Sequence, residues 1–269
     1  MAANRVFSEL VSNKYLRWTV VRFYTVLGNV SAKLALDPIV ELPLGLIGID
    51  SRFALHLFKR DVTALVEVFV NRVYEASCNL LPGDTVVDCG ANIGEFTVHA
   101  ARLVGREGLV VAFEPNPESF SLCKTNILRN KLENVMLFNK ALGEREETAF
   151  LEIDGANLGG SKIVWKPSRN SSLRVAVRPL TEFLPLVGTR TIKLLKLDVE
   201  GSAIDIINGG DEFFEKRLIQ NVAAELHPGE EQLRKFLEDR EFTCKQVGSY
   251  LYAALEPEKQ GTGHENSRA

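Results

Sequence analysis

The sequence lacks the cysteine patterns that mark secreted and zinc-binding proteins. Its 269 residues contain only four cysteines, Cys78, Cys89, Cys123 and Cys244, and no two of them form a Cys-x-x-Cys pair. A zinc site or a disulfide framework needs closer or paired spacing. We therefore expect the cysteines to be small apolar side chains of a protein in a reducing compartment.

Long hydrophobic runs are also missing. No uncharged stretch of the sequence approaches the roughly 20 apolar residues that a helix needs to span a bilayer. The N-terminal apolar residues are interrupted by charges and lack a small-residue cleavage site, so no signal peptide is predicted. The expected location is the cytoplasm.

An excess of positive charge is absent as well, because the formal net charge at pH 7 is -3. Proteins that coat nucleic acid need a basic surface, so no nucleic-acid partner is expected. Residues 1–36 are the exception, since five basic residues face one acidic residue there and aromatic residues lie between them. The helical stretch at 6–34 is expected to pack on the domain or to mediate self-association. The alternative is a peripheral contact with an anionic membrane.

What the sequence does contain, from about Thr85 onward, is a regular alternation of short apolar runs and amphipathic stretches. This alternation is typical of an α/β fold with a parallel sheet. The last two apolar runs are close together and are expected to form an antiparallel pair at the sheet edge. The expected strands are 85–89, 109–113, 135–138, 192–197, 218–226, 242–247 and 250–255, and the expected helices are 96–104, 117–128, 203–214 and 230–239.

Three parts of the chain follow from this pattern. Residues 1–80 are expected to form a cap of a helix at 6–34, two short strands within 40–58 and a second helix at 62–76. Residues 81–256 form the sheet domain, and residues 257–269 are polar and expected to be disordered. The insertion at 144–179 is rich in glycine and polar residues, so loops with one hairpin are expected there. This insertion is equally expected to contact a substrate or to be a variable loop without a function.

The segment Asp88-x-Gly90-x-x-x-Gly94 lies where the first of these strands turns into a helix. The carboxyl ends of the strands form the usual ligand crevice of an open α/β sheet. Glycines allow a sharp turn and a close approach of the backbone to a ligand. Free N–H groups at the helix start favour a ligand carboxylate, and Asp88 is placed to hold an ammonium group nearby.

A second acidic residue, Glu114, ends the next strand. An acid at this place can accept hydrogen bonds from both hydroxyls of a ribose. A dinucleotide fingerprint needs Gly-x-Gly-x-x-Gly, and Asp88 occupies the position of its first glycine. The pattern therefore favours the methyl donor S-adenosylmethionine over a nicotinamide dinucleotide. A merely tight turn is the structural alternative.

Four motifs occur in order along the chain: Val87–Gly94, Phe113–Pro117, Ala141–Gly143 and Lys196–Gly201. With these motifs the stretch from about Asp61 to Pro228 resembles the FkbM family of S-adenosylmethionine-dependent methyltransferases. The resemblance implies the Rossmann-like fold of a class I methyltransferase, a seven-stranded, mostly parallel sheet with helices on both faces. It also implies methylation of oxygen on small molecules or sugars, as in most characterised members.

The resemblance further implies which residues hold the donor. Asp198, at the end of the fourth strand, belongs to the family's Asp-Val-Glu-Gly signature, and we expect it to face the positive sulfonium or to anchor the loop. The other contacts would come from the first three strand ends: Asp88, Gly90, Asn92 and Gly94 for the methionine part, Glu114, Pro115 and Asn116 for the ribose, and Asn139 and Ala141 for the adenine.

Methyl transfer to a hydroxyl needs an aligned acceptor and a base that removes its proton. The catalytic candidates at the ends of the fourth and fifth strands are Asp198, Glu200, Glu225 and His227. His227 is the preferred base, because its ordinary pKa of about 6.5 suits proton removal near neutrality. A solvated histidine before a turn is the alternative. Asp198 and Glu225 would suit magnesium, but no third ligand is obvious and no metal is predicted.

One residue departs from the family pattern. Many members carry a glutamate two residues after Gly201, where this chain has Ala203. This departure supports the alternative of a cofactor-binding partner subunit without activity. RNA methylation is a further alternative, although the chain beyond residue 36 is acidic. The leading prediction is O-methylation of a small molecule, a sugar or a lipid-linked glycan.

Overall fold

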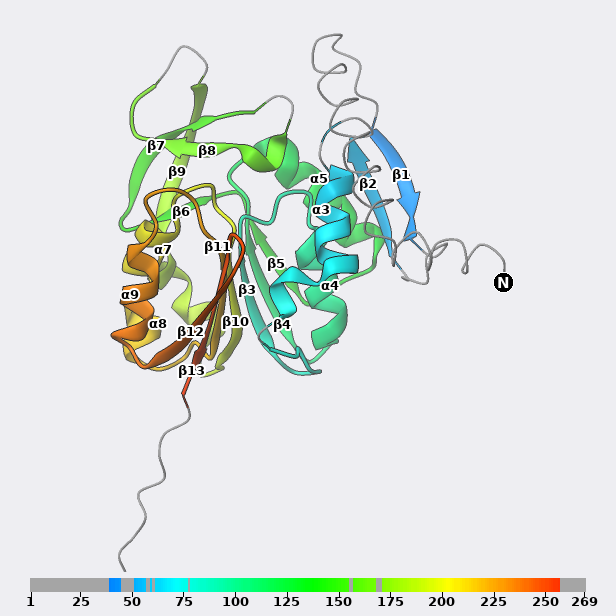
Figure 1. The fold of residues 1–269 in the computed structure, drawn as a ribbon. Coiled ribbons are helices and arrows are strands. Elements are labelled where there is room, and N and C mark those ends of the chain that lie inside the picture. The colour runs from blue at the N-terminus through cyan, green and yellow to red at the C-terminus, as the bar shows by residue number, and fades with distance from the viewer. Residues whose placement is uncertain are drawn as a thin grey trace, which may run out of the picture.

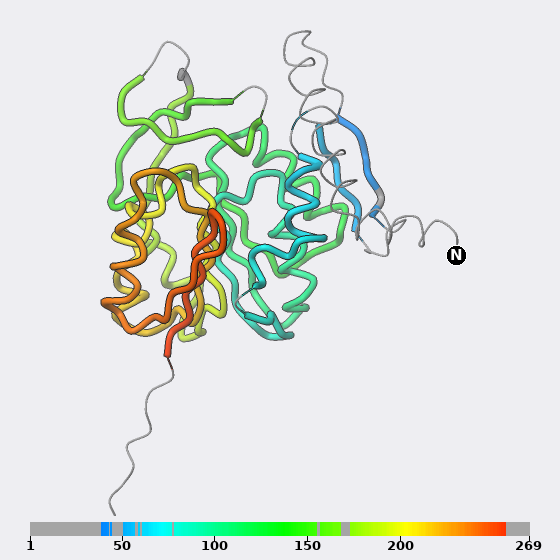
Figure 2. Tube along the Cα trace, in the orientation of Figure 1, coloured from blue at the N-terminus to red at the C-terminus, as the bar shows by residue number. Residues whose placement is uncertain are grey.

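The computed structural model describes residues 39–44, 51–56, 59, 61–76, 78–154, 157–167 and 171–256. The predicted helix at 6–34 and the predicted tail at 257–269 lie outside the described residues. The ribbon in Figure 1 and the tube in Figure 2 show three groups of elements: a central sheet with its helices, a smaller sheet above it, and a pair of N-terminal strands at one side.

The central sheet has seven strands, with the spatial order β12-β13-β11-β10-β3-β4-β5. The strands from β11 to β5 are parallel, whereas β13 pairs antiparallel with both β11 and β12. The predicted mostly parallel sheet and its edge pair are therefore confirmed. The strand bounds are Thr85–Cys89 (β3), Leu109–Phe113 (β4), Val135–Phe138 (β5), Ile192–Leu197 (β10), Asn221–Glu225 (β11), Phe242–Val247 (β12) and Tyr250–Leu255 (β13).

Strand β11 is shorter than the predicted strand at 218–226. Ile219 makes only an isolated parallel bridge to Ile192, so the regular ladder begins at Asn221. All five residues of the neighbouring strand β3 are buried, because helices cover both faces of the sheet. Successive side chains of a strand point to opposite faces, so Val86 and Val87 belong to two different hydrophobic cores.

The helices divide between the two faces. Helix α4 (Glu95–Val104) and helix α5 (Pro117–Arg129) pack in the core that contains Val86. The opposite core holds side chains of α6 (Leu184–Val187), α7 (Ala203–Gly209), α8 (Asp211–Glu215) and α9 (Gln232–Glu238). The predicted start of α5 is confirmed, since the Asn116 side chain accepts from the N–H of Glu118 and Pro117 is the first helical residue.

The single helix predicted at 203–214 is wrong in one respect. Gly210, with φ −111° and ψ 10°, separates α7 from α8. A β-carbon at Gly210 would lie 3.1 Å from Leu180, so the interruption also lets the chain pass close to the core. Both short helices bury their apolar side chains in the same core. The amphipathic pattern of the sequence therefore continues through the break and gives no sign of it.

The insertion forms a second sheet rather than loops with one hairpin. Its order is β6-β9-β7-β8, with β6 (Ala141–Gly143), β7 (Glu147–Glu152), β8 (Lys162–Val164) and β9 (Ser171–Pro179). The inward residues Ala149, Leu151, Val175 and Val177 form a small hydrophobic core of their own. Figure 1 shows this sheet above the carboxyl ends of the central strands. The glycine content of the insertion concealed the alternating residues that form it.

The described N-terminal elements are a strand pair followed by a broken helix. The two short strands that the sequence predicts are β1 (Ile39–Pro43) and β2 (Arg52–His56), and the structure pairs them antiparallel. The helix predicted at 62–76 is instead α3 (Asp61–Val66), a π-helical turn (Glu67–Asn71) and a 3₁₀ turn (Val73–Glu75). The break falls at Arg72, whose φ of 51° is left-handed. The division of the chain at residue 80 stays a prediction.

Asn126 fastens β2 to α5. Its side-chain amide donates to the backbone oxygens of Ala54 and Ile93 at 3.0 and 2.8 Å, and its oxygen accepts from the N–H of Ala54 at 2.6 Å. All three bonds are buried or nearly so, because Asn126 is fully enclosed. A single polar side chain therefore satisfies the backbone of a strand edge and of the β3–α4 turn at once.

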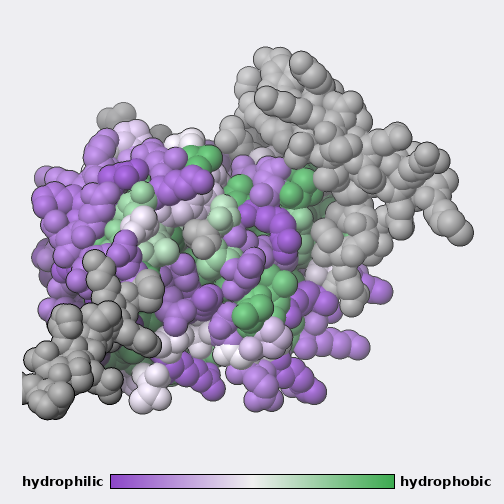
Figure 3. Space-filling model, turned by 60° about the horizontal axis from the view of Figure 1, so that its bottom comes forward, coloured by the Kyte–Doolittle hydropathy of each residue, from purple (hydrophilic) through white to green (hydrophobic). Residues whose placement is uncertain are grey.

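Apolar side chains on the surface are dispersed. Figure 3 shows the end of the molecule opposite the second sheet, where apolar residues occur in small groups among hydrophilic ones. Within the described ranges, we find no helix with the length and apolar composition that crossing a bilayer requires.

Replacing Asn126 with alanine would leave these backbone groups buried without partners. We expect Asn126→Ala to lower the free energy of unfolding by about 2–4 kcal/mol. Urea denaturation followed by circular dichroism measures this loss. The control is Lys124→Ala on the exposed side of the same helix, which should change stability by less than about 0.5 kcal/mol. Equal stability of both variants would show that Asn126 does not hold the strand.

Candidate active site

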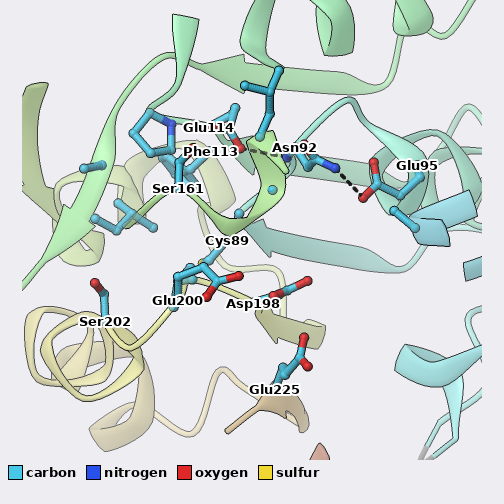
Figure 4. A pocket seen from close by; sticks show the side chains of 18 of the residues that line it. Cys89, Asn92, Glu95, Phe113, Glu114, Ser161, Asp198, Glu200, Ser202 and Glu225 are labelled. Carbon is cyan, nitrogen blue, oxygen red and sulfur yellow. Dashed lines mark hydrogen bonds between the residues drawn. The ribbon is translucent and has the colours of Figure 1, made fainter. Parts of the chain in front are cut away.

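A cavity opens at the carboxyl end of the central sheet, with a volume of about 1220 Å³ including its mouth. Three parts of the chain form its walls, and Figure 4 shows how their side chains converge. The central sheet contributes Cys89, Gly90, Asn92, Glu95, Phe113, Glu114, Pro115, Asp198, Val199, Glu200, Ser202, Ile206 and Glu225; the second sheet and the segment leading to it contribute Lys140, Ala141, Leu142, Asn157, Leu158, Gly159, Ser161 and Ile163; the N-terminal elements contribute Thr63, Ala64, Glu67, Val68 and Tyr74.

The turn between β3 and α4 forms the floor of this cavity. Gly90 has a φ of +85°, and a β-carbon there would lie 1.8 Å from the backbone oxygen of Asp198. Gly94 has a φ of +90° and would place a β-carbon 2.8 Å from the sulfur of Cys123. Both positions therefore require glycine, one for contact with β10 and the other for contact with α5.

The N–H groups of this turn are not free, contrary to the expectation from sequence. Gly90 and Ala91 both donate to the backbone oxygen of Phe113, at 3.0 and 2.9 Å. Asn92 donates to Glu114 and Gly94 donates to the oxygen of Ala91. Oxygen atoms of the protein therefore accept hydrogen bonds from all four of these N–H groups. These groups are not free to bind a ligand carboxylate.

Asp88 lies behind the turn in a buried ion pair. Its Oδ1 lies 2.9 Å from the Nζ of Lys196, and its Oδ2 accepts from the hydroxyl of Thr97 at 2.6 Å. Lys196 also donates to the backbone oxygen of Gly90 at 2.8 Å. Burial disfavours the charged ammonium of Lys196, but Asp88 and Asp198 outweigh it and raise its pKa. Asp88 is fully buried and is not among the residues that line the cavity.

Glu114 occupies the place that the sequence predicts for a ribose acceptor. It ends β4 and lines the cavity, and its two oxygens accept from the backbone N–H groups of Asn92 and Asn116 at 2.7 and 2.8 Å. Burial raises the pKa of Glu114 to about 7. Each carboxylate oxygen retains a second lone pair, so the group can still accept hydrogen bonds from a ligand.

The remaining predicted donor contacts fall into two groups. Pro115 and Ala141 line the cavity beside Glu114. Asn139 and Asn116 support the walls from behind: Asn139 donates to the backbone oxygens of Glu114 and Pro115 at 2.8 and 3.2 Å, and Asn116 is buried as the cap of α5. The structure therefore separates residues that can touch a ligand from residues that hold them.

Asp198, Glu200 and Glu225 line the other end of the cavity, whereas His227 lies beside them and is not among the lining residues. Asp198, Glu225 and His227 each offer one atom such that these atoms all lie within 4.8 Å of one another. The Nδ1 of His227 is 3.6 Å from Oε2 of Glu200. The Nε2 of His227 is buried and has no hydrogen-bond partner among the described residues. Convergence follows from topology, because parallel neighbouring strands end at the same edge.

Negative charge accumulates at this end. Burial together with the carboxylates of Asp198 and Glu67 raises the pKa of Glu225 to about 7. Burial, followed by Asp198, also raises the pKa of Glu200, although His227 opposes the shift. Asp198 itself accepts a hydrogen bond of 2.6 Å from the hydroxyl of Tyr74. An N-terminal residue thus fixes the carboxylate that ends β10.

Sequence reasoning missed three residues of the site. Lys196 gave a signal, since a lysine inside an otherwise apolar strand must be paired. Glu95 gave a weaker signal, as an acidic residue that directly follows the glycine turn. Tyr74 gave none, because its contact with Asp198 joins positions that are 124 residues apart.

The fold and the site together define a class I methyltransferase. The strand order with an antiparallel edge pair, the glycine turn after β3 and the acid at the end of β4 are its elements. Residues 88–245 match the sequence profile described as the Methyltransferase FkbM domain. This match covers more than half of the chain, so the protein belongs to the FkbM methyltransferase family.

Several named proteins are similar to this chain in sequence. The chain is 29% identical over 181 residues to Methyltransferase 1 of Beauveria bassiana, a match that covers 60% of this chain and 71% of the relative. It is 28% identical over 191 residues to the 31-O-demethyl-FK506 methyltransferase FkbM of Streptomyces tacrolimicus, covering 60% and 72%. Among solved structures, Methyltransferase FkbM from Methylobacillus flagellatus is similar with a TM-score of 0.47 and 16% identity, covering 64% of this chain and 43% of that one.

Removing the cation beneath the turn would leave the Asp88 carboxylate buried and unpaired. We expect Lys196→Met to lower the free energy of unfolding by about 3–5 kcal/mol, and the double variant with Asp88→Asn to lose less. Urea denaturation of both variants measures the difference. Lys193→Met on the same strand is the control, because Lys193 is only half-buried. A double variant that is less stable than Lys196→Met would contradict the pairing.

Proposed function

We propose that this methyltransferase uses S-adenosylmethionine to methylate an oxygen atom of a small molecule, a sugar or a lipid-linked glycan. The observation that carries the proposal is the pairing of a side-chain-free turn at Gly90 with the acid Glu114 at the adjoining strand end, both on the wall of one cavity. The names of relatives support oxygen as the acceptor atom, since one acts on a 31-O-demethyl compound.

The lining residues fit an amino acid linked to a nucleoside. Glu114 would accept hydrogen bonds from the ribose hydroxyls, and Pro115 and Ala141 would border the adenine. Gly90, which lines the cavity next to Asp198, would border the thioether region. Asp198 lies at the adjacent strand end, where its carboxylate would face a positive sulfonium. When bound, the cofactor supplies an electrophilic methyl group and a good leaving group.

The protein's own chemical task is then to take a proton from the acceptor hydroxyl. His227 is the proposed base, because its buried Nε2 is unpartnered while Glu200 lies 3.6 Å from its Nδ1. The negative charge of Glu200 at this distance would stabilise the imidazolium that forms. Glu225 and Asp198 would position the acceptor beside this histidine.

The walls of the cavity restrict the class of acceptor. Among the lining residues that the structure describes, six are acidic and only Lys140 is basic. Such a surface repels a phosphate backbone, so RNA is a poor acceptor. Thr63, Ala64 and Val68 add a small and partly apolar wall next to the acids. A neutral, hydroxyl-bearing molecule fits this combination best.

A divalent cation is the alternative role for the catalytic group. The convergence of Asp198, Glu225 and His227 supplies the third ligand that the sequence did not reveal. Oxygen-rich sites with one imidazole suit magnesium or manganese. In that case His227 would be a ligand and the cation would activate the acceptor hydroxyl.

Donor binding tests the proposed function directly. We expect S-adenosylhomocysteine to bind the wild-type protein with micromolar affinity in isothermal titration calorimetry, and NAD to show no heat of binding. The reason is that the turn carries Asp88 where a dinucleotide site needs glycine. Glu114→Ala should abolish the signal because the ribose loses its acceptor. Tight binding of NAD, or no binding of S-adenosylhomocysteine, would overturn the assignment.

His227→Ala separates the base from the metal ligand. We expect transfer of labelled methyl groups to a small-molecule extract to fall by roughly 100- to 10,000-fold, with the affinity for S-adenosylhomocysteine unchanged within about twofold. Wild-type activity should persist in a chelator. Activity that a chelator abolishes and magnesium restores would favour the metal site instead. His99→Ala, in α4, is the control histidine variant.

A further inference from the structure

The three acidic residues around the glycine turn differ in how well their oxygens are satisfied. Both oxygens of Asp88 are taken, one by Lys196 and one by Thr97. Both oxygens of Glu114 accept backbone N–H groups. Glu95, the first residue of α4, is the exception, and its carboxylate is the one that remains incomplete.

Only one oxygen of Glu95 has a donor. Its Oε1 accepts from the side-chain amide of Asn92 at 3.1 Å, whereas Oε2 is buried and has no hydrogen-bond partner among the described residues. Glu95 is 9% exposed, and it lines the cavity, where Figure 4 shows its carboxylate beside Asn92. A buried carboxylate oxygen without a donor is costly, so an orphan of this kind calls for an explanation.

No neighbouring cation of the protein fills the vacancy. The nearby buried lysine, Lys196, donates hydrogen bonds to Asp88 and to the backbone oxygen of Gly90. The wall next to Glu95 adds another acid, Glu67, and no basic residue. A ligand in the cavity can supply the missing donor, and a positively charged N–H donor suits the surplus of negative charge.

We propose that Oε2 of Glu95 is the binding site of a primary ammonium group, and that this group is the α-ammonium of the methyl donor. The inference rests on the proposed function and adds to it a residue that the glycine motif does not include. It moves the ammonium contact from Asp88, which the ion pair with Lys196 already satisfies, to the next acid along the turn. The hydrogen bond from Asn92 holds the carboxylate in position.

Two ligands that differ in the amino-acid part test this assignment. S-adenosylhomocysteine carries the ammonium group, and 5′-methylthioadenosine has the same nucleoside and sulfur without it. Calorimetry on Glu95→Gln should show a loss of affinity for S-adenosylhomocysteine of roughly 10- to 100-fold, the range of a charge-assisted hydrogen bond. The affinity for 5′-methylthioadenosine should stay within about twofold, which also reports that the pocket is intact.

Glu107→Gln is the matched control, because Glu107 is exposed after the same helix and should affect neither ligand. An equal loss for both ligands in Glu95→Gln would mean that Glu95 shapes the turn, and it would overturn the proposal. Unchanged affinity for S-adenosylhomocysteine would also overturn it, because a neutral glutamine lacks the negative charge to which the ammonium group is proposed to bind. Wild-type protein that binds neither ligand would instead refute the proposed function, and this inference with it.

Discussion

The buried ammonium of Lys196 joins the carboxyl ends of β3 and β10 and the turn between β3 and α4. It bonds to Asp88 and to the oxygen of Gly90, and it lies 3.8 Å from Asp198. The close contact of Gly90 with the backbone of Asp198 depends on the same arrangement. Because an unpaired charge at this depth is very unfavourable, the pair fixes the distance between the two strand ends. The floor of the cavity and the end that holds Asp198 are thereby joined in one unit by the buried lysine.

Charge is distributed unequally over this unit, and the distribution separates structural from functional acids. Asp88 is neutralised by Lys196. Glu114 combines both roles, because two backbone N–H groups hold its oxygens while it lines the cavity and burial raises its pKa to about 7. Glu95 and Glu225 lack comparable partners, and burial raises their pKa values to about 8 and about 7. Acids whose charge the protein leaves uncompensated are suited to bind or to exchange protons, whereas compensated acids are suited to hold the frame. Of these acids, only Glu95 has a buried oxygen without a hydrogen-bond partner among the described residues.

Much of the fold could be predicted from the sequence, because local patterns set it. The apolar run at Thr85–Cys89 and the cap at Asn116 gave correct elements, since strand burial and helix capping depend on neighbours in sequence. Gly210 misled the prediction because a glycine inside a helical pattern is often tolerated, and here it ends a helix. The second sheet was missed because its pairing of β6 with β9 joins segments about 35 residues apart, which no local pattern records.

The sequence by itself determined the class of the protein and the position of the glycine turn, because both depend on residue types at fixed spacing. It also placed Glu114 and the four catalytic candidates at strand ends, where parallel topology brings them to one edge. Only the tertiary structure decided which acidic side chains have hydrogen-bond or ion-pair partners within the protein. The partner of Asp88 comes from β10 and the partner of Asp198 comes from Tyr74, and contacts between such distant residues exist only once the chain has packed.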